Sequence, residues 1–344
     1  MINLLRVFAV LSFLGPVGCG SDRGPTVVVY SSVDEPYSRP ILEAFAAQTG
    51  IRVLMRFDTE ADKTVGLTHR LIEESRNPRA DVFWNSEVIQ TVRLARRGVL
   101  APHRSSPLAD RADEFQGERG LWTGLAGRLR VLIYNTDLVA DAEAPRSIAD
   151  LAAGRFRGKA TMARPFAGTT ATHAAALWAR LGGDAARAFF RRLRENDVHL
   201  ASGNAHVRDL VASGAFAIGL TDTDDAHEGR RRGVPIRIVF PDQEVGFPGV
   251  PEPLGSFFIP NTVALVAGGP NPAAGAKLIE YLLSAEVEAR LSRCGSAQIP
   301  VRATLDPPTG LGVPAGLEVM HVSYAVAERA LEEATPFLKE LFLR

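Results

Sequence analysis

Residues Ala80-Asp-Val-Phe-Trp84 and the helical stretch from Val88 to Arg97, which Gly98 ends, decide the fold class of this chain. The apolar run predicts a buried strand, and the helix follows it directly. The same order occurs upstream, where the β-branched run at 26–30 precedes an amphipathic stretch at 41–49 and an alternating strand at 51–57. Strands connected through helices run parallel, with helices on the faces of their sheet. The sequence therefore predicts an α/β fold with largely parallel sheets.

Length and composition limit the possible classes of function. The chain has 344 residues, of which 46% are hydrophobic, enough for two domains with separate cores. Its formal net charge of zero argues against a general nucleic-acid binder, which needs a basic surface. The sequence contains no Gly-x-Ser-x-Gly elbow, Walker loop or His-Glu-x-x-His motif, so it indicates no common enzyme class.

The N-terminus is typical of a secreted bacterial protein. Arg6 precedes an apolar run at 7–14, and Gly15-Pro-Val-Gly-Cys19 follows. The run is too short to span a bilayer, so we predict that residues 1–19 are a signal peptide. A cysteine after small residues resembles a lipoprotein cleavage box, which predicts lipidation of Cys19, a tether at 20–25 and a membrane-anchored periplasmic protein. The alternative is an ordinary cleaved signal in which Cys19 is incidental.

An acidic turn, Asp222-Thr-Asp-Asp225, follows the apolar run Phe216-Ala-Ile-Gly-Leu220 and opens a predicted helix. One aspartate is enough to cap a helix. Three carboxylates at the carboxyl end of a strand, where α/β sheets place their ligands, indicate a binding site instead. Like charges this close raise each other's pKa unless a cation joins them, and carboxylates suit hard cations or ammonium groups. The alternative is a helix cap rich in aspartate.

Other polar residues occupy comparable positions at strand ends and helix starts. Arg128 and Arg130 share one face of their strand and suit an anion, although surface ion pairs would explain them too. The start of a helix at Gly168 offers backbone N–H groups and hydroxyls, which also suit an anion. The predicted ligand contacts are Ser31, Ser32, Asp34, Asn85, Ser86, Glu87, Arg128, Arg130, Gly168, Thr169, Thr170, Asp222, Thr223, Asp224 and Asp225.

Six segments follow one another in a particular order and spacing. They are Val27-Val-Val-Tyr-Ser-Ser32, Phe45-Ala-Ala-Gln-Thr-Gly-Ile-Arg-Val53, Ala80 to Glu87, Gly98-Val-Leu-Ala-Pro102, Arg130-Val-Leu-Ile-Tyr-Asn-Thr136 and Ala273 to Val287. Together they resemble the ferric-iron-binding group of ABC-transporter solute-binding proteins over about residues 26 to 302. The resemblance implies a type II periplasmic-binding-protein fold: two lobes, each a mostly parallel sheet flanked by helices, with the ligand cleft between them.

The resemblance also implies a division of the chain and a mode of action. It predicts lobe 1 at 26–127 with 246–300, lobe 2 at 128–245 with 301–344, and crossings near 124–130 and 245–255. The implied mechanism is hinge closure on a solute and delivery to the permease and ATPase of an ABC importer. We expect a monomer with no catalytic residues.

The family's iron ligands do not carry over directly. Its two adjacent tyrosines belong at the turn that here reads Asp222-Thr-Asp-Asp225, and both are absent. We predict a metal ion, iron by resemblance, with a companion anion, and the metal ligands Asp34, Glu87, Asp222 and Asp224. The open alternatives are an organic amine, a phosphonate or another small anion in the same fold, and a metal-assisted hydrolase.

Overall fold

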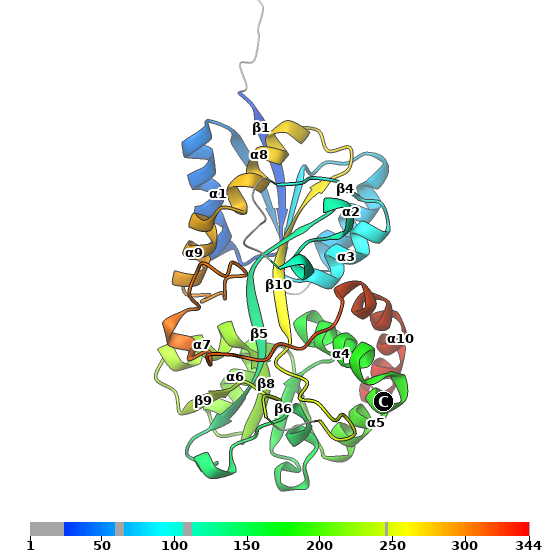
Figure 1. Ribbon diagram of the computed structural model, residues 1–344, viewed down its shortest axis with the longest axis vertical. Helices are drawn as coiled ribbons and strands as arrows, with labels where there is room; N and C mark the ends of the chain where they lie inside the picture. Colours follow the sequence, from blue (N-terminus) through cyan, green and yellow to red (C-terminus); the bar gives the residue numbers. More distant parts are fainter. Residues whose placement is uncertain (1–23, 59–64, 106–111, 245–246, 344) are drawn as a thin grey trace, which may run out of the picture.

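The computed structural model describes residues 24–58, 65–105, 112–244 and 247–343. Within them the chain forms two lobes, one above the other, with a narrowing between them (Figure 1). The predicted signal peptide, the lipidation of Cys19 and most of the predicted tether lie outside the described residues. No helix in these four segments is long and apolar enough to cross a membrane.

The strands are β1 (Thr26–Ser31), β2 (Arg52–Phe57), β3 (Val82–Asn85), β4 (Leu100–Ala101), β5 (Thr123–Asn135), β6 (Ala160–Ala163), β7 (His199–Ala201), β8 (Ile218–Asp222), β9 (Ile236–Val239) and β10 (Phe258–Val266). Their order in the sheet is β2-β1-β3-β10-β5-β8-β6-β7, with β4 paired to β10 and β9 to β5. Strand β1 is parallel to β2 and β3, and β6 is parallel to β7 and β8. The predicted α/β class with parallel sheets is confirmed.

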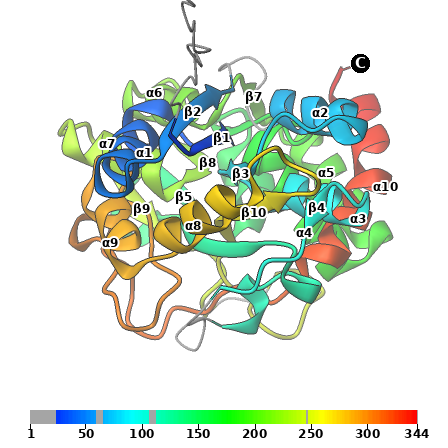
Figure 2. The same cartoon turned by 90° about the horizontal axis from the view of Figure 1, so that it is seen from above.

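The α-helices are α1 (Glu35–Thr49), α2 (Gly66–Glu73), α3 (Val88–Arg96), α4 (Gly168–Leu181), α5 (Gly183–Glu195), α6 (Asn204–Ala212), α7 (Thr223–Arg231), α8 (Pro272–Leu282), α9 (Ala285–Arg293) and α10 (Tyr324–Leu343). Helices α1, α2, α3, α8 and α9 surround the upper lobe, and α4 to α7 surround the lower one (Figures 1 and 2). Helix α10 packs on α4 and α5 and also contacts α3, so it touches both lobes.

Local sequence explains why the first helix forms where it does. The side chains of Ile41, Leu42 and Phe45 are buried along one face of α1, as expected for an amphipathic helix. Gly50 ends the helix with a φ of 69°, a left-handed conformation that glycine adopts without steric cost. The helix therefore packs its apolar face on β1 and β2 of the upper lobe, in the core that includes Val29.

Strands β5 and β10 connect the two lobes. The first half of β5 pairs antiparallel with β10, and its second half pairs with β8 and β9 of the lower lobe. The strands approach closely at Gly127, where a Cβ would lie 2.5 Å from the carbonyl oxygen of Ile259. The crossing predicted near 124–130 lies within β5, and a pair of strands makes a natural hinge between lobes.

The second connection is β10, which begins after the proline-rich stretch at 245–255. Residues 245 and 246 lie outside the described residues. The part that follows belongs to the lower lobe, because the ring of Phe247 packs against that of Phe189 in α5 at 5.2 Å between centroids. Proline cannot donate to a sheet ladder, so a proline-rich segment is poorly suited to a crossing made of paired strands. The predicted lobe boundaries stay a prediction.

Asp242, just after β9, gives a testable pH dependence of stability. Its side chain is buried, and burial raises its pKa to about 6. Because this folded-state pKa exceeds the unfolded value of about 4, stability falls as the pH rises through this interval. Asn fits the φ of 59° at this position without the charge.

We expect Asp242→Asn to raise the free energy of unfolding by about 1–3 kcal/mol at about pH 8, and by much less at about pH 4. Urea unfolding of both proteins at the two pH values measures this difference. A gain of equal size at both pH values would show that the charge is not its cause.

Candidate functional site

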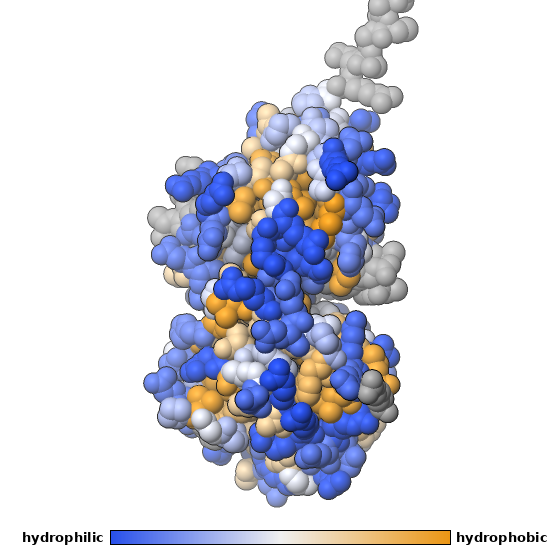
Figure 3. Space-filling model, turned by 90° about the vertical axis from the view of Figure 1, so that its right-hand side faces the viewer, coloured by the Kyte–Doolittle hydropathy of each residue, from blue (hydrophilic) through white to orange (hydrophobic). Residues whose placement is uncertain are grey.

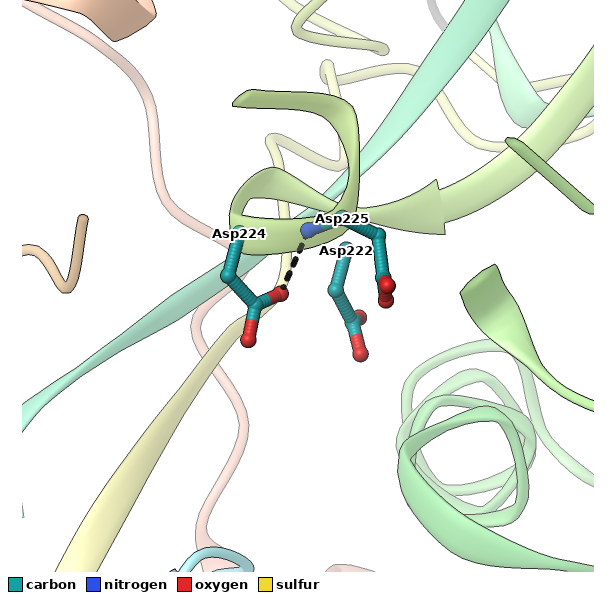
Figure 4. A group of neighbouring side chains, drawn as sticks. All are labelled: Asp222, Asp224 and Asp225. Atoms are coloured by element: carbon teal, nitrogen blue, oxygen red, sulfur yellow. Dashed lines mark hydrogen bonds between the residues drawn. The ribbon is translucent and has the colours of Figure 1, made fainter. Parts of the chain in front are cut away.

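The acidic turn lies at the end of β8, where the lower lobe meets the upper one. Asp222 is the last residue of β8, and Thr223 begins α7. One carboxylate oxygen from each of Asp222, Asp224 and Asp225 lies within 4.8 Å of the other two (Figure 4). The backbone N–H of Asp225 donates to Asp224 Oδ1 at 3.0 Å. The predicted strand and helix are both present, and they bring the three carboxylates together.

Asp222 is the centre of a buried polar network. Its Oδ1 accepts from Arg130 Nη1 at 2.6 Å, and its Oδ2 accepts from Thr169 Oγ1 at 2.6 Å and Asn204 Nδ2 at 2.8 Å. Arg130 also donates to Thr170 Oγ1 at 3.3 Å. The Asp222 carboxylate makes no cap bond to α7. It is therefore not the simple helix cap of the alternative interpretation, and both of its oxygens accept hydrogen bonds; its role as a metal ligand stays a prediction.

Asp224 and Asp225 have more distant ion-pair partners than Asp222 has. Arg128 Nη1 lies 3.4 Å from Asp224 Oδ2, and Arg208 Nη1 lies 3.9 Å from Asp225 Oδ1. Burial raises the pKa of Asp224, the Arg128 guanidinium opposes that rise, and the Asp222 carboxylate adds to it. Burial, followed by the charges of Asp224 and Asp222, raises the pKa of Asp225 well above its usual range. A bound cation would therefore stabilise the ionised forms of these two carboxylates most.

The upper lobe brings Asp34 and Tyr37 towards this turn. Asp34 precedes α1, makes no side-chain cap bond, and its charge contributes to the raised pKa of Asp224. Burial raises the pKa of Tyr37, and nearby acidic groups that include Asp34 and Asp224 raise it further. Tyr37 is not among the contacts predicted from the sequence. Its position in the first turn of α1, three residues after Asp34, was the available signal.

Helix α4 contributes hydroxyls to the network, and its first residues do not make a simple cap. Thr169 donates to Asp222, while Thr170 Oγ1 lies 3.3 Å from Asn204 Oδ1. Gly168 has a φ of 55° at the helix start, which favours glycine. Asn204, at the start of α6, was also missed, because nothing in its local sequence distinguishes it from any polar residue at a helix start.

In the upper lobe, the predicted contact Glu87 lies in the turn between β3 and α3. Glu87 accepts from the backbone N–H groups of Ile89 at 2.6 Å and Gln90 at 3.0 Å, and so caps α3. Thr172 Oγ1 of α4 donates to Glu87 Oε1 at 2.7 Å, which links the two lobes. Burial raises the pKa of Glu87. Both oxygens accept hydrogen bonds, so Glu87 is a helix cap and a contact between lobes in this structure, and its role as a metal ligand stays a prediction.

Three serines and one asparagine near Glu87 also make hydrogen bonds within the protein. Ser32 Oγ donates to Asn85 Oδ1 and accepts from the backbone N–H of Ser86 at 2.9 Å. Asn85 Nδ2 donates to Thr91 Oγ1 at 3.0 Å. Ser31 Oγ accepts from the backbone N–H of Val33 at 3.2 Å. These side chains are buried and hold the turns after β1 and β3 together.

Comparison with known proteins places the chain in a family. Residues 41–310 match the family described as bacterial extracellular solute-binding protein. The chain belongs to this family. The "Fe(3+)-binding periplasmic protein" of Serratia marcescens is 26% identical over 219 residues, which are 64% of this chain and 62% of that relative. A periplasmic protein of Salmonella typhimurium, named for 2-aminoethylphosphonate binding, is 29% identical over 314 residues, which are 89% of this chain and 86% of the relative.

Solved structures share the fold of this solute-binding protein. Iron-bound HitA from Pseudomonas aeruginosa superposes with a TM-score of 0.77 at 23% identity, covering 93% of this chain and 100% of that one. The ferric binding protein from Campylobacter jejuni gives 0.80 at 20% identity, with 92% and 99% covered. At these identities the likeness shows the fold alone. It confirms the two-lobed, type II periplasmic-binding architecture.

Proposed function

We propose that this protein captures a small charged solute between its lobes and delivers it to the permease and ATPase of an ABC importer. Family membership supports capture of a solute outside the cytoplasm. The carboxylates of Asp222, Asp224 and Asp225, within 4.8 Å of one another at the end of β8, are the observation that carries the site. Closure about the paired strands β5 and β10 would bring Asp34 onto the solute from the other lobe.

The proposed solute is a hard metal cation such as ferric iron, held with a companion anion. Carboxylate oxygens are hard donors, and Asp34, Asp224 and Asp225 supply them. Asp222 holds Arg130 and shapes the site. Arg128 and the start of α4 are the proposed anion contacts. The Serratia relative, named for Fe(3+) binding, supports this choice.

The balance of charge around the turn also favours a cation. Four carboxylates, those of Asp34, Asp222, Asp224 and Asp225, act on one another there. Three guanidiniums, those of Arg128, Arg130 and Arg208, lie within ion-pair distance of them. Arg208 is also paired with Asp209 at 2.7 Å, so the group carries a net negative charge when all its members are ionised, and a bound cation would reduce that charge.

A zwitterion such as 2-aminoethylphosphonate is the second candidate. The same site offers Asp224 and Asp225 to an ammonium group, and Arg128 with the start of α4 to a phosphonate. The Salmonella relative named for this compound covers 89% of the chain. The absence of the family's tyrosine pair at the acidic turn removes the strongest reason for iron, and this also supports the zwitterion.

Calorimetry on the mature protein separates the two solutes. Ferric citrate, citrate alone and 2-aminoethylphosphonate are titrated separately, after elemental analysis and native mass spectrometry have excluded a bound ligand. Tight binding of ferric citrate but not of citrate supports the metal. Tight binding of 2-aminoethylphosphonate alone supports the zwitterion. Turnover of a phosphate ester in place of stoichiometric binding would contradict both and support the hydrolase alternative.

We further propose that the mature protein is a monomer anchored to the cell membrane through a lipid on Cys19. The cleavage-box resemblance and the short polar stretch at 20–25 support the anchor. Cys19→Ala should block processing or release the protein from the membrane fraction, as measured by fractionation and mass spectrometry. A wild-type protein that is wholly soluble, with Cys19 removed or unmodified, would contradict the anchor.

A further inference from the structure

A cavity lies on the flank of the molecule away from α7. It has a volume of about 510 Å³ and is bounded by α3, the segment at 113–122 and the start of α10. Figures 1 and 2 place α10 and α3 on one side of the molecule and α7 on the other. Figure 3 views the molecule from the side of α10 and shows the narrowing between the lobes. The cavity has the size of a small-molecule site, about 300–1,000 Å³.

Aromatic side chains form one wall of this cavity. Trp122 and Tyr324 are both buried, with their rings edge to face at 6.3 Å between centroids. Val92 and Ala95 of α3 extend the apolar surface. The Tyr324 hydroxyl donates to the carbonyl of Phe258 at 3.1 Å, which fixes the ring. Such a wall can cover the apolar body of a ligand, and the aromatic faces attract a positive charge.

Glu328 supplies the matching negative charge. It lies one turn after Tyr324 on α10, lines the cavity and is only 2% exposed. Its Oε1 accepts from Arg96 Nη2 at 2.9 Å, but its Oε2 is buried without a hydrogen-bond partner among the described residues. A buried carboxylate oxygen without a donor costs free energy, which an N–H group of a ligand would recover.

The other charged residues around the cavity do not cancel the negative charge of Glu328. Arg96 is shared between Glu328 and the exposed Glu332, so its charge is already matched. Carboxylates outnumber guanidiniums in the wall; the charged residues are Arg96, Asp113, Glu114, Glu118, Arg119, Glu328 and Arg329. The wall as a whole therefore prefers a cation to an anion.

We propose that this cavity binds a small organic cation, an amine with an apolar body. The ammonium group pairs with the carboxylate of Glu328, and the apolar body lies against Trp122 and Tyr324. The site is separate from the acidic turn and does not depend on the proposed function. Its walls come from α3 of the upper lobe and from α10, which packs on the lower lobe.

Calorimetric titration of the mature protein with 2-phenylethylamine tests the site. 3-Phenylpropionate, of nearly equal shape and opposite charge, is the matched ligand and should bind at least about tenfold more weakly. Glu328→Gln should weaken amine binding about tenfold, while Glu332→Gln, which removes the exposed partner of Arg96, should change it less than about twofold. Ala95→Phe fills the cavity without a change of charge and should abolish binding.

Two further results decide the assignment. Asp224→Asn should leave amine binding unchanged, since an effect there would place the amine at the acidic turn. Trp122→Phe should remove the fluorescence change that accompanies binding. The proposal is overturned if neither probe binds at millimolar concentration, if both probes bind equally, or if Glu328→Gln and Glu332→Gln have the same effect in folded protein. Circular dichroism melts establish that each variant is folded.

Discussion

Asp222→Ala should destabilise the folded protein by about 3–5 kcal/mol, because it leaves a buried guanidinium without its partner. The side chain of Arg130 is fully buried and that of Asp222 nearly so, and their atoms lie 2.6 Å apart. Removal of the carboxylate also takes the acceptor from Thr169 and Asn204. Breaking a buried pair costs far more than the pair contributes when both partners are present.

Urea unfolding of the wild type and a matched variant measures this effect. Asp197→Asn breaks an ion pair with Arg157 that is exposed on both sides, suits the φ of 54° at this position, and should cost less than about 1 kcal/mol. The double variant Arg130→Met with Asp222→Leu, which removes both charges, should lose less stability than Asp222→Ala alone. Equal losses for Asp222→Ala and Asp197→Asn would show that the buried network does not stabilise the lower lobe.

Arg130 and Asp222 illustrate what the sequence could and could not predict. Periodicity identified both strands, and the two-residue spacing of Arg128 and Arg130 placed them on one face. In the sheet, Arg130 lies directly opposite Asp222 in the antiparallel pair of β5 and β8. Cross-strand neighbours form pairs of this kind. Nothing local in the sequence states which strands are neighbours, so the ion pair between Arg130 and Asp222 could not be predicted.

Glu87 shows a second limit of sequence reasoning. A carboxylate between a strand and a helix suits a helix cap and a ligand contact equally well, because both roles use the same position in α/β folds. In the structure its oxygens accept from α3 and from Thr172 of the other lobe. Asp34 occupies the comparable position before α1 and makes no cap bond. Only tertiary contacts distinguish the two residues.

Asp224→Asn should weaken binding of a cationic solute about a hundredfold, or about 3 kcal/mol. Asp224 is partly buried and pairs with Arg128 at 3.4 Å, so it is the carboxylate best placed to exchange that partner for a bound cation. Calorimetry with the cation identified for the wild type measures the loss. Asp184→Asn, which removes an exposed carboxylate at the start of α5 that pairs with Arg187, is the control and should change affinity less than about threefold.

The pH dependence of binding provides an independent test of the acidic turn. Burial raises the pKa of both Asp224 and Asp225, so protons compete with a cation at a higher pH than for an ordinary aspartate. Cation affinity should therefore fall as the pH drops through an interval above the usual carboxyl range of about 4. In Asp224→Asn the remaining fall should move to lower pH, because the Asp224 charge helps to raise the pKa of Asp225.

An anionic solute gives the opposite result. Asp224→Asn frees Arg128 from its partner, so anion affinity should stay the same or increase, and the pH dependence in the acidic range should weaken. A zwitterion would lose its ammonium contact and keep its anion contact, which gives an intermediate loss. If the Asp222→Asn and Asp224→Asn variants both bind the true solute as tightly as the wild type, the acidic turn has a structural role only. The proposal that its carboxylates bind the solute is then wrong.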